Sequence, residues 1–140
     1  MGLVRNIFIL SFLVLFISSC ATTTERILDT DESALKLRSI QSRVFDTTDR
    51  ETTLRTIIAT MQDLSFVINK ADLDLGSISG TKLKGYKLTM TVTVLPRGEK
   101  QIVVRANASL GIKPIVEPEP YQDFFTSLEK SMFLEAQDIN

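Results

Sequence analysis

The stretch YKLTMTVTVLPRGEKQIVVRANASL, from Tyr86 to Leu110, decides the fold. Apolar residues take the even positions of its two halves, and mainly polar residues take the odd positions. This alternation is typical of antiparallel strands with one dry and one wet face. A three-residue loop at Pro96–Gly98 pairs Met90 with Val104 and keeps every even position on one face. We therefore predict a β-hairpin.

The wet face of this hairpin is the candidate partner-binding surface. It would present hydroxyl, amide and guanidinium groups, which can all hydrogen-bond to a protein. The alternative is a face that is simply solvated. The residues concerned are Thr89, Thr91, Thr93, Arg105 and Asn107.

Amphipathic helices are predicted on both sides of the hairpin in the sequence. Upstream, Thr48 and Glu51 have the spacing of a capping box, followed by an apolar stripe. Downstream, the proline-rich segment IKPIVEPEP predicts a linker, and Pro120 suits the first turn of the last helix. We expect both stripes to pack in the core, although the aromatic residues of the second could form a ligand box or a partner-binding face instead. The stripes are Leu54, Ile57, Ile58, Met61 and Leu64, and then Tyr121, Phe124, Phe125, Leu128, Met132, Ala136 and Ile139.

The remaining segments complete a sheet. SFVINKADLDLGSISGTKL predicts two short strands around a turn at Asp74–Gly76. The D-x-D-x-G pattern from Asp72 is not a calcium loop, because its glycine comes one position early and Leu83 replaces the bidentate glutamate. Another strand is predicted at about Ser39–Phe45. Together these elements indicate an α+β fold, an antiparallel sheet of four to five strands with two helices packed on one face.

The N-terminus is typical of a secretory leader. After Arg5, the apolar run Ile7–Ile17 has 11 residues, and a membrane-spanning helix needs about 20. The next residues, Ile17–Cys20, resemble the lipobox of bacterial lipoproteins. This resemblance implies cleavage between Ser19 and Cys20 and diacylglycerylation of the Cys20 thiol, the only cysteine. Two or three acyl chains on one residue would anchor the protein stably.

The predicted address is the outer membrane, with the domain facing the periplasm, because Ala21 follows the cysteine as in the enterobacterial sorting pattern. We expect a signal peptide at 1–19, a flexible tether at 20–34 and a single domain at 35–140. Removal of the signal peptide would also remove Arg5, so the mature chain would carry 15 basic and 17 acidic side chains. This balance does not suggest nucleic-acid binding. The expected partners are the membrane, through the acylated cysteine, and an envelope protein.

Two longer stretches resemble a family of short bacterial outer-membrane lipoproteins. The first stretch begins with RVFDTTD and contains a predicted helix that ends in MQDLSF. The second stretch contains YQDFF and KSMFLEA. Ser65 stands where that family has glycine, so we expect a less abrupt helix stop. The order of elements is similar to the helix-grip outline of BamC-like lipoproteins of outer-membrane assembly. The first family implies no activity, and a fold outline does not carry function.

No catalytic pattern stands out. The chain contains no histidine, and it has no G-x-S-x-G motif or glycine-rich phosphate loop. We expect no enzyme activity, no cofactor and no metal site. Carboxylate pairs at Asp46/Asp49 and Asp72/Asp74 are expected at turns and helix starts, where aspartate has a capping role. Two functions remain open: a non-catalytic interaction protein of an outer-membrane complex, and a module that binds a lipid or another small apolar ligand.

Overall fold

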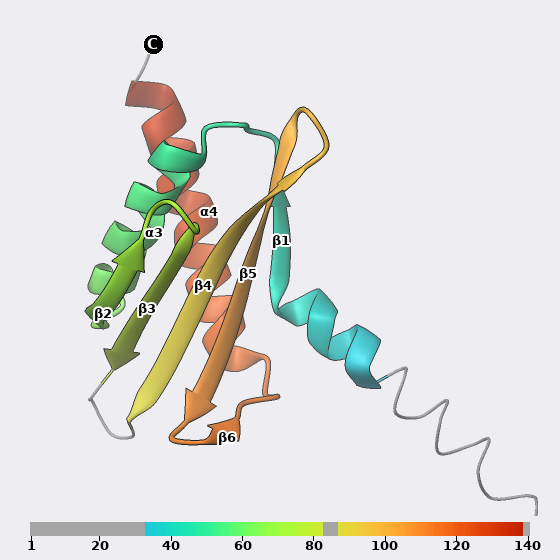
Figure 1. Ribbon diagram of the computed structural model, residues 1–140, viewed down its shortest axis with the longest axis vertical. Coiled ribbons are helices and arrows are strands. Elements are labelled where there is room, and N and C mark those ends of the chain that lie inside the picture. Colours follow the sequence, from blue (N-terminus) through green and yellow to red (C-terminus); the bar gives the residue numbers. More distant parts are fainter. Residues whose placement is uncertain (1–32, 83–86, 139–140) are drawn as a thin grey trace, which may run out of the picture. The chain divides into compact units, whose positions relative to one another are not determined.

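This computed structural model describes residues 33–82 and 87–138. Its strands are β1 (Ser42–Phe45), β2 (Val67–Asp72), β3 (Ser77–Lys82), β4 (Leu88–Arg97), β5 (Gln101–Leu110) and β6 (Lys113–Pro114). The labelled helices are α3 (Arg50–Asp63) and α4 (Glu119–Asp138), and residues 33–40 are also helical. The strands form one six-stranded antiparallel sheet in the order β1-β5-β4-β3-β2, with β6 also paired to β5 (Figure 1). The predicted α+β class is confirmed.

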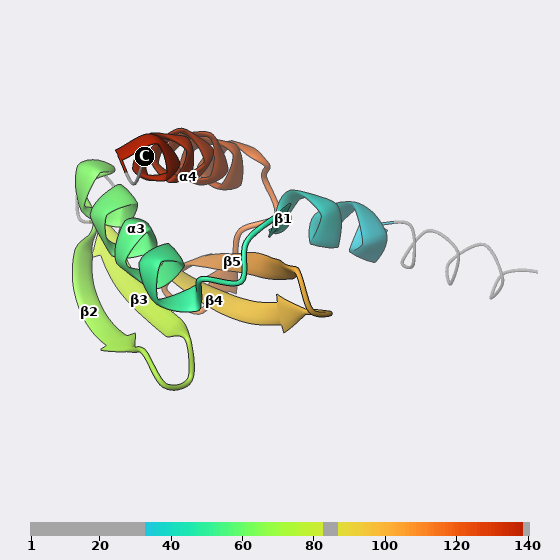
Figure 2. The ribbon, with the colours of Figure 1, turned by 90° about the horizontal axis from the view of Figure 1, so that it is seen from above.

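Both helices cover the same face of the sheet, as seen from above in Figure 2. The even residues of β4 and β5 point toward them, and Met90, Val92 and Val104 are buried. The apolar stripes of the helices pack on this face as predicted. Ile58, Leu64 and Met132 are only partly buried. The side chains of Ala136 and Ile139 are not among those described. The small Ala106 and Ala108 are buried beneath the helices. The fully buried apolar residues of the helices are Leu54, Ile57, Met61, Tyr121, Phe124, Phe125 and Leu128.

The hairpin exists, but its predicted register is wrong by four residues. Met90 pairs with Ala108, and the strands continue to the pair Arg97–Gln101, so the loop is residues 98–100. Gly98 does take the left-handed conformation, with φ 64°. Because the shift is an even number of residues, every side chain stays on its predicted face.

Proline at position 96 is tolerated inside β4 because of where β3 begins. The Val94 amide donates to the carbonyl of Gly76, just before β3, at 2.9 Å. Backbone nitrogens two residues apart in a strand point the same way. The nitrogen of Pro96 therefore points beyond the start of β3, where no donor is needed.

Three predicted boundaries also change. The capping residue of α3 is Asp49 and not Thr48: an Asp49 carboxylate oxygen accepts from the Thr52 amide at 2.9 Å. A carboxylate is a strong acceptor and also suits the positive end of the helix dipole. β1 starts only at Ser42, because residues 33–40 are helical. The last two residues of the predicted tether belong to this helix, and the compact unit with the sheet runs from Leu37 to Asn140.

The outer edge of β5 is covered by several different segments. β1 pairs with its first half, and β6 pairs with its last two residues. Between them, the Ala106 amide donates to the Gln41 carbonyl at 2.8 Å and the Ala108 amide donates to the Tyr121 hydroxyl at 3.2 Å. A side chain of α4 therefore fills the gap that the two short strands leave.

Candidate functional site

The five predicted surface residues come together on the open face of the sheet. Within the described chain, both labelled helices lie on the opposite face (Figure 2). In the observed register, Thr91 is opposite Asn107 and Thr93 is opposite Arg105. The three threonines, Thr89 included, are partly exposed, while Arg105 and Asn107 are exposed. We call these five residues the open-face cluster.

The polar character of the open face continues onto β3. Its residues Ser77, Ser79 and Thr81 pair with the three threonines of β4. The Thr81 hydroxyl donates to the Asn69 side-chain oxygen at 2.7 Å and lies 3.4 Å from the Thr89 hydroxyl. Hydroxyl side chains of β3 and β4 therefore lie beside the exposed Arg105 and Asn107, and these groups can exchange hydrogen bonds with a protein.

The predicted anchor lies elsewhere in the chain. Ser19, Cys20 and most of the tether lie outside the described residues. Within 33–82 and 87–138, no helix is long and apolar enough to cross a membrane. The lipid attachment therefore stays a prediction from the sequence.

Three of the four candidate carboxylates, those of Asp46, Asp49 and Asp72, accept hydrogen bonds. The Asp46 carboxylate accepts from the Gln101 side chain at 2.6 Å, and that of Asp72 accepts from the Leu75 amide at 2.9 Å. Hydrogen bonds from the Thr52 hydroxyl and amide lower the pKa of the Asp49 carboxyl below its ordinary value. Among the described residues, no three histidine, cysteine or acidic side chains gather in a way that could hold a metal ion.

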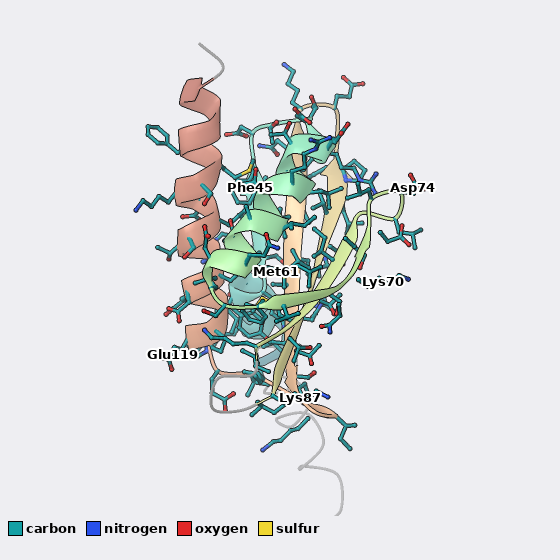
Figure 3. The ribbon with its side chains drawn as sticks, turned by 90° about the vertical axis from the view of Figure 1, so that its left-hand side faces the viewer. Phe45, Met61, Lys70, Asp74, Lys87 and Glu119 are labelled. Atoms are coloured by element: carbon teal, nitrogen blue, oxygen red, sulfur yellow. The ribbon has the colours of Figure 1, made fainter. Side chains whose placement is uncertain are left out.

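A groove at one end of the molecule was not predicted from the sequence. It measures about 530 Å³ and lies between the start of α4, the end of β3, the start of β4 and the end of β5. In Figure 3, Glu119 at the start of α4 and Lys87, just before β4, mark this end, and Asp74 marks the opposite one. The apolar lining is Leu64, Phe66, Leu88, Leu110, Ile115 and Pro120; the charged lining is Lys82, Glu117, Glu119 and Asp123.

The sequence held a partial indication of this groove. The segment IVEPEP alternates apolar and acidic residues, which we interpreted only as a linker. Its Ile115 is buried in the core, while Glu117 and Glu119 stay exposed at the groove. The other lining residues come from distant segments, so no local pattern could have joined them.

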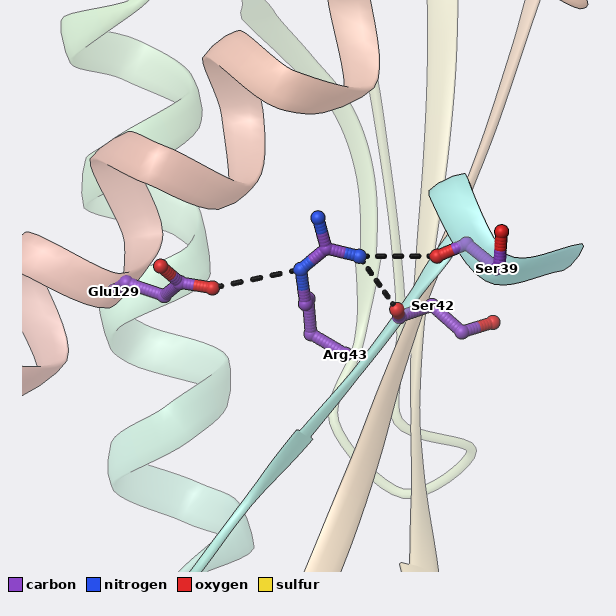
Figure 4. A network of polar contacts seen from close by, with 4 residues as sticks. All are labelled: Ser39, Ser42, Arg43 and Glu129. Atoms are coloured by element: carbon purple, nitrogen blue, oxygen red, sulfur yellow. Dashed lines mark hydrogen bonds and ion pairs between the residues drawn. The ribbon is translucent and has the colours of Figure 1, made fainter. Parts of the chain in front are cut away.

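The residues of the resembling motifs support the fold. The Arg43 guanidinium donates to the Ser39 and Ser42 carbonyls at 3.0 Å and lies 3.5 Å from the Glu129 carboxylate (Figure 4). It also lies 5.0 Å from the centre of the Phe125 ring, so it ties β1 to α4. No protein-family model matches this chain, and no curated protein matches it, so the family resemblance stays a prediction.

Proposed function

We propose that this chain is a lipid-anchored, non-catalytic component of the bacterial outer membrane that docks to an envelope protein through its open-face cluster. The leader and the lipobox-like residues Ile17–Cys20 support the anchor. The absence of histidine and the capping or hydrogen-bonding roles of Asp46, Asp49 and Asp72 support a non-catalytic role.

The observation that carries the proposal is the difference between the two faces of one sheet. One face is closed by α3 and α4, and the other presents Thr89, Thr91 and Thr93 beside two exposed polar residues (Figure 2). A wet sheet face of hydroxyl and amide groups can exchange its water for hydrogen bonds to a partner with little structural change. A docking role therefore needs no rearrangement of the domain.

In-cell photo-cross-linking tests the proposal. A benzophenone amino acid replaces Thr91 or Asn107 in the anchored protein, and irradiation of living cells should give a discrete adduct with an envelope protein. The matched control places the same amino acid at Thr126, which is exposed on α4. Equal adducts from Thr126, or none from the open-face cluster, would refute docking through this face.

The groove supports a second candidate, a module that binds a lipid or small apolar ligand, because six of its lining residues are apolar. We still expect the delipidated protein to fold without a ligand, since the core beneath the helices is filled by large side chains. A ligand at a hundred times its dissociation constant would add about 2.7 kcal/mol to the stability, a shift of several degrees in Tm. A thermal melt with envelope phospholipids and fatty acids measures this. A reproducible rise in Tm, or a lipid retained in native mass spectrometry, would favour the second candidate.

A further inference from the structure

We propose that the groove between the start of α4, the end of β3, the start of β4 and the end of β5 binds an apolar segment of a partner protein that carries lysine or arginine residues. This inference rests on the proposed function, because it assigns the partner a second point of contact. The groove lies on the helix-covered side of the sheet, whereas the open-face cluster lies on the other face.

The floor of the groove is apolar and accessible from outside. Phe66 and Ile115 are almost buried, Leu64 and Leu88 are partly exposed, and Leu110 is 41% exposed. Apolar side chains that converge on a concave site are what an anchoring leucine or phenylalanine of a partner requires.

The apolar surface continues beyond the groove. Ile112, in the turn between β5 and β6, is fully exposed, and Val116 is 57% exposed. Both belong to the same chain segment as the lining residues Leu110 and Ile115. An occupant that also covers Ile112 and Val116 must be longer than a single small molecule in the groove, which favours a polypeptide segment.

The charges of the rim determine which segment fits. Among the lining residues, the three exposed carboxylates of Glu117, Glu119 and Asp123 outnumber one lysine, Lys82. The exposed Lys87 and Lys113 are not part of this lining. The Lys82 ammonium lies 5.7 Å from the centre of the Phe66 ring. Among the described residues, none of the three carboxylates forms an ion pair. Like charges would repel a fatty-acid carboxylate or an anionic head group, whereas basic side chains beside an apolar anchor complement this rim.

A binding measurement with two peptides tests the inference. The first is a labelled amphipathic peptide with leucines on one side and lysines on the other; the second has glutamate in place of every lysine. The full chain is held in phosphatidylcholine nanodiscs, and empty discs are the blank. Fluorescence anisotropy should show binding of the lysine peptide only, and a benzophenone on this peptide should cross-link to residues 110–117.

Charge variants distinguish binding in the groove from nonspecific electrostatic attraction of the peptide to the protein. E117Q/E119Q/D123N should weaken binding of the lysine peptide about tenfold, because each exposed ion pair contributes modestly. The control E51Q/D74N/E99Q removes the same number of exposed carboxylates away from the groove and should change binding less than about twofold. All six side chains are exposed, so both variants should keep the fold.

Several results would overturn the inference. The groove would not be the binding site if the two triple variants weakened binding equally or if the two peptides bound equally. Cross-links from the peptide to the open face would exclude it as well. A cross-link from Ile112 to disc lipid in place of peptide would assign this end to the membrane, and a dimer that blocks the peptide would assign it to a second copy of the chain. If Asn107 still cross-links a partner in cells while the groove binds no peptide, only this inference fails. If no position cross-links a partner, the proposed function fails as well.

Discussion

Ser65 shows how a single residue can end a helix under strain. Its φ is 67°, the left-handed region, and it is the only described residue other than glycine with a positive φ. The Ser65 amide donates to the Gln62 carbonyl at 2.9 Å and the Phe66 amide donates to the Met61 carbonyl at 2.8 Å. These bonds form a Schellman-type stop, so the expectation of a less abrupt helix end was wrong. The chain adopts the geometry that glycine would adopt more easily.

Replacing Ser65 with glycine should therefore stabilise the domain. Relief of left-handed strain outweighs the greater freedom of glycine in the unfolded chain, and we expect the free energy of unfolding to rise by about 0.5 to 1 kcal/mol. Urea unfolding of a chain that starts at residue 33 measures this. Ser65→Ala is the matched control and should give no gain, because alanine keeps the same strain. A Ser65→Gly variant no more stable than the Ser65→Ala variant would contradict the explanation.

At the scale of elements, α4 completes the sheet as well as covering it. The Tyr121 hydroxyl is buried and donates to the Ile115 carbonyl at 2.7 Å, while it accepts from the Ala108 amide and, at 3.1 Å, from the Gln41 side chain. One hydroxyl thus joins β5, the segment after β6 and the segment before β1. The close approach of α3 has a different cause: a Cβ at Gly80 of β3 would lie 2.8 Å from the Met61 methyl carbon, so the missing side chain at Gly80 leaves this space to Met61.

Tyr121→Phe should destabilise the domain although the ring remains. The Ala108 amide and the Ile115 carbonyl would lose their Tyr121 partner in a buried site, and we expect a loss of about 1 to 3 kcal/mol. Urea unfolding gives the total effect. Hydrogen exchange locates it: the Ala108 amide should exchange faster, while the Ala106 amide, which bonds to the Gln41 carbonyl, serves as the internal control. Unchanged exchange at Ala108 would show that this hydroxyl does not hold the edge.

The aromatic residues of α4 allow a matched test of core packing. Phe125 is buried and meets Phe124 edge to face with ring centres 5.1 Å apart, whereas Phe133 is 63% exposed. Phe125→Ala should lower the free energy of unfolding by about 3 to 5 kcal/mol. Phe133→Ala removes the same ring from the same helix and should stay within about 0.5 kcal/mol of the wild type. Similar losses from both substitutions would mean that Phe133 is covered in solution.

Different regions of the molecule would have different roles in the proposed function. The leader and Cys20 would provide attachment, the helix-covered face provides stability, and the open face and the groove would meet a partner. Most of the predicted tether precedes the first described residue, so the domain would be held by a short chain. Because an extended chain spans at most about 3.6 Å per residue, such a tether would keep the domain close to the membrane surface.

The anchor can be tested on the complete chain. Cys20→Ala should abolish acylation and release or mislocalise the protein, because no other thiol is present. Metabolic labelling with a fatty acid, followed by membrane fractionation, measures both effects. Ser19→Ala is the control and should still be labelled, since the lipobox needs only a small residue at that position. A lipid label that survives Cys20→Ala would disprove the attachment site.

Residue order alone is enough to assign the faces of the strands and helices. Periods of two and of about 3.6 residues are local properties, so the dry side of β4 and β5, the buried stripes of both helices and all five residues of the open-face cluster followed from residue order. The even register shift left these assignments intact, because a shift by two or four residues does not turn a side chain over.

Features that depend on distant partners follow from the packing of the whole fold. Turn chemistry favours a loop at Pro96–Gly98, but Pro96 fits inside β4 because β3 begins short of this position. Strand order, the Tyr121 contacts at the edge of β5 and the groove combine segments that are far apart in the chain. Leu64, just after α3, and Asp123 of α4 line the same groove. Each residue pattern reports only its own segment, and the packing of helices and strands on one sheet determines which segments become neighbours.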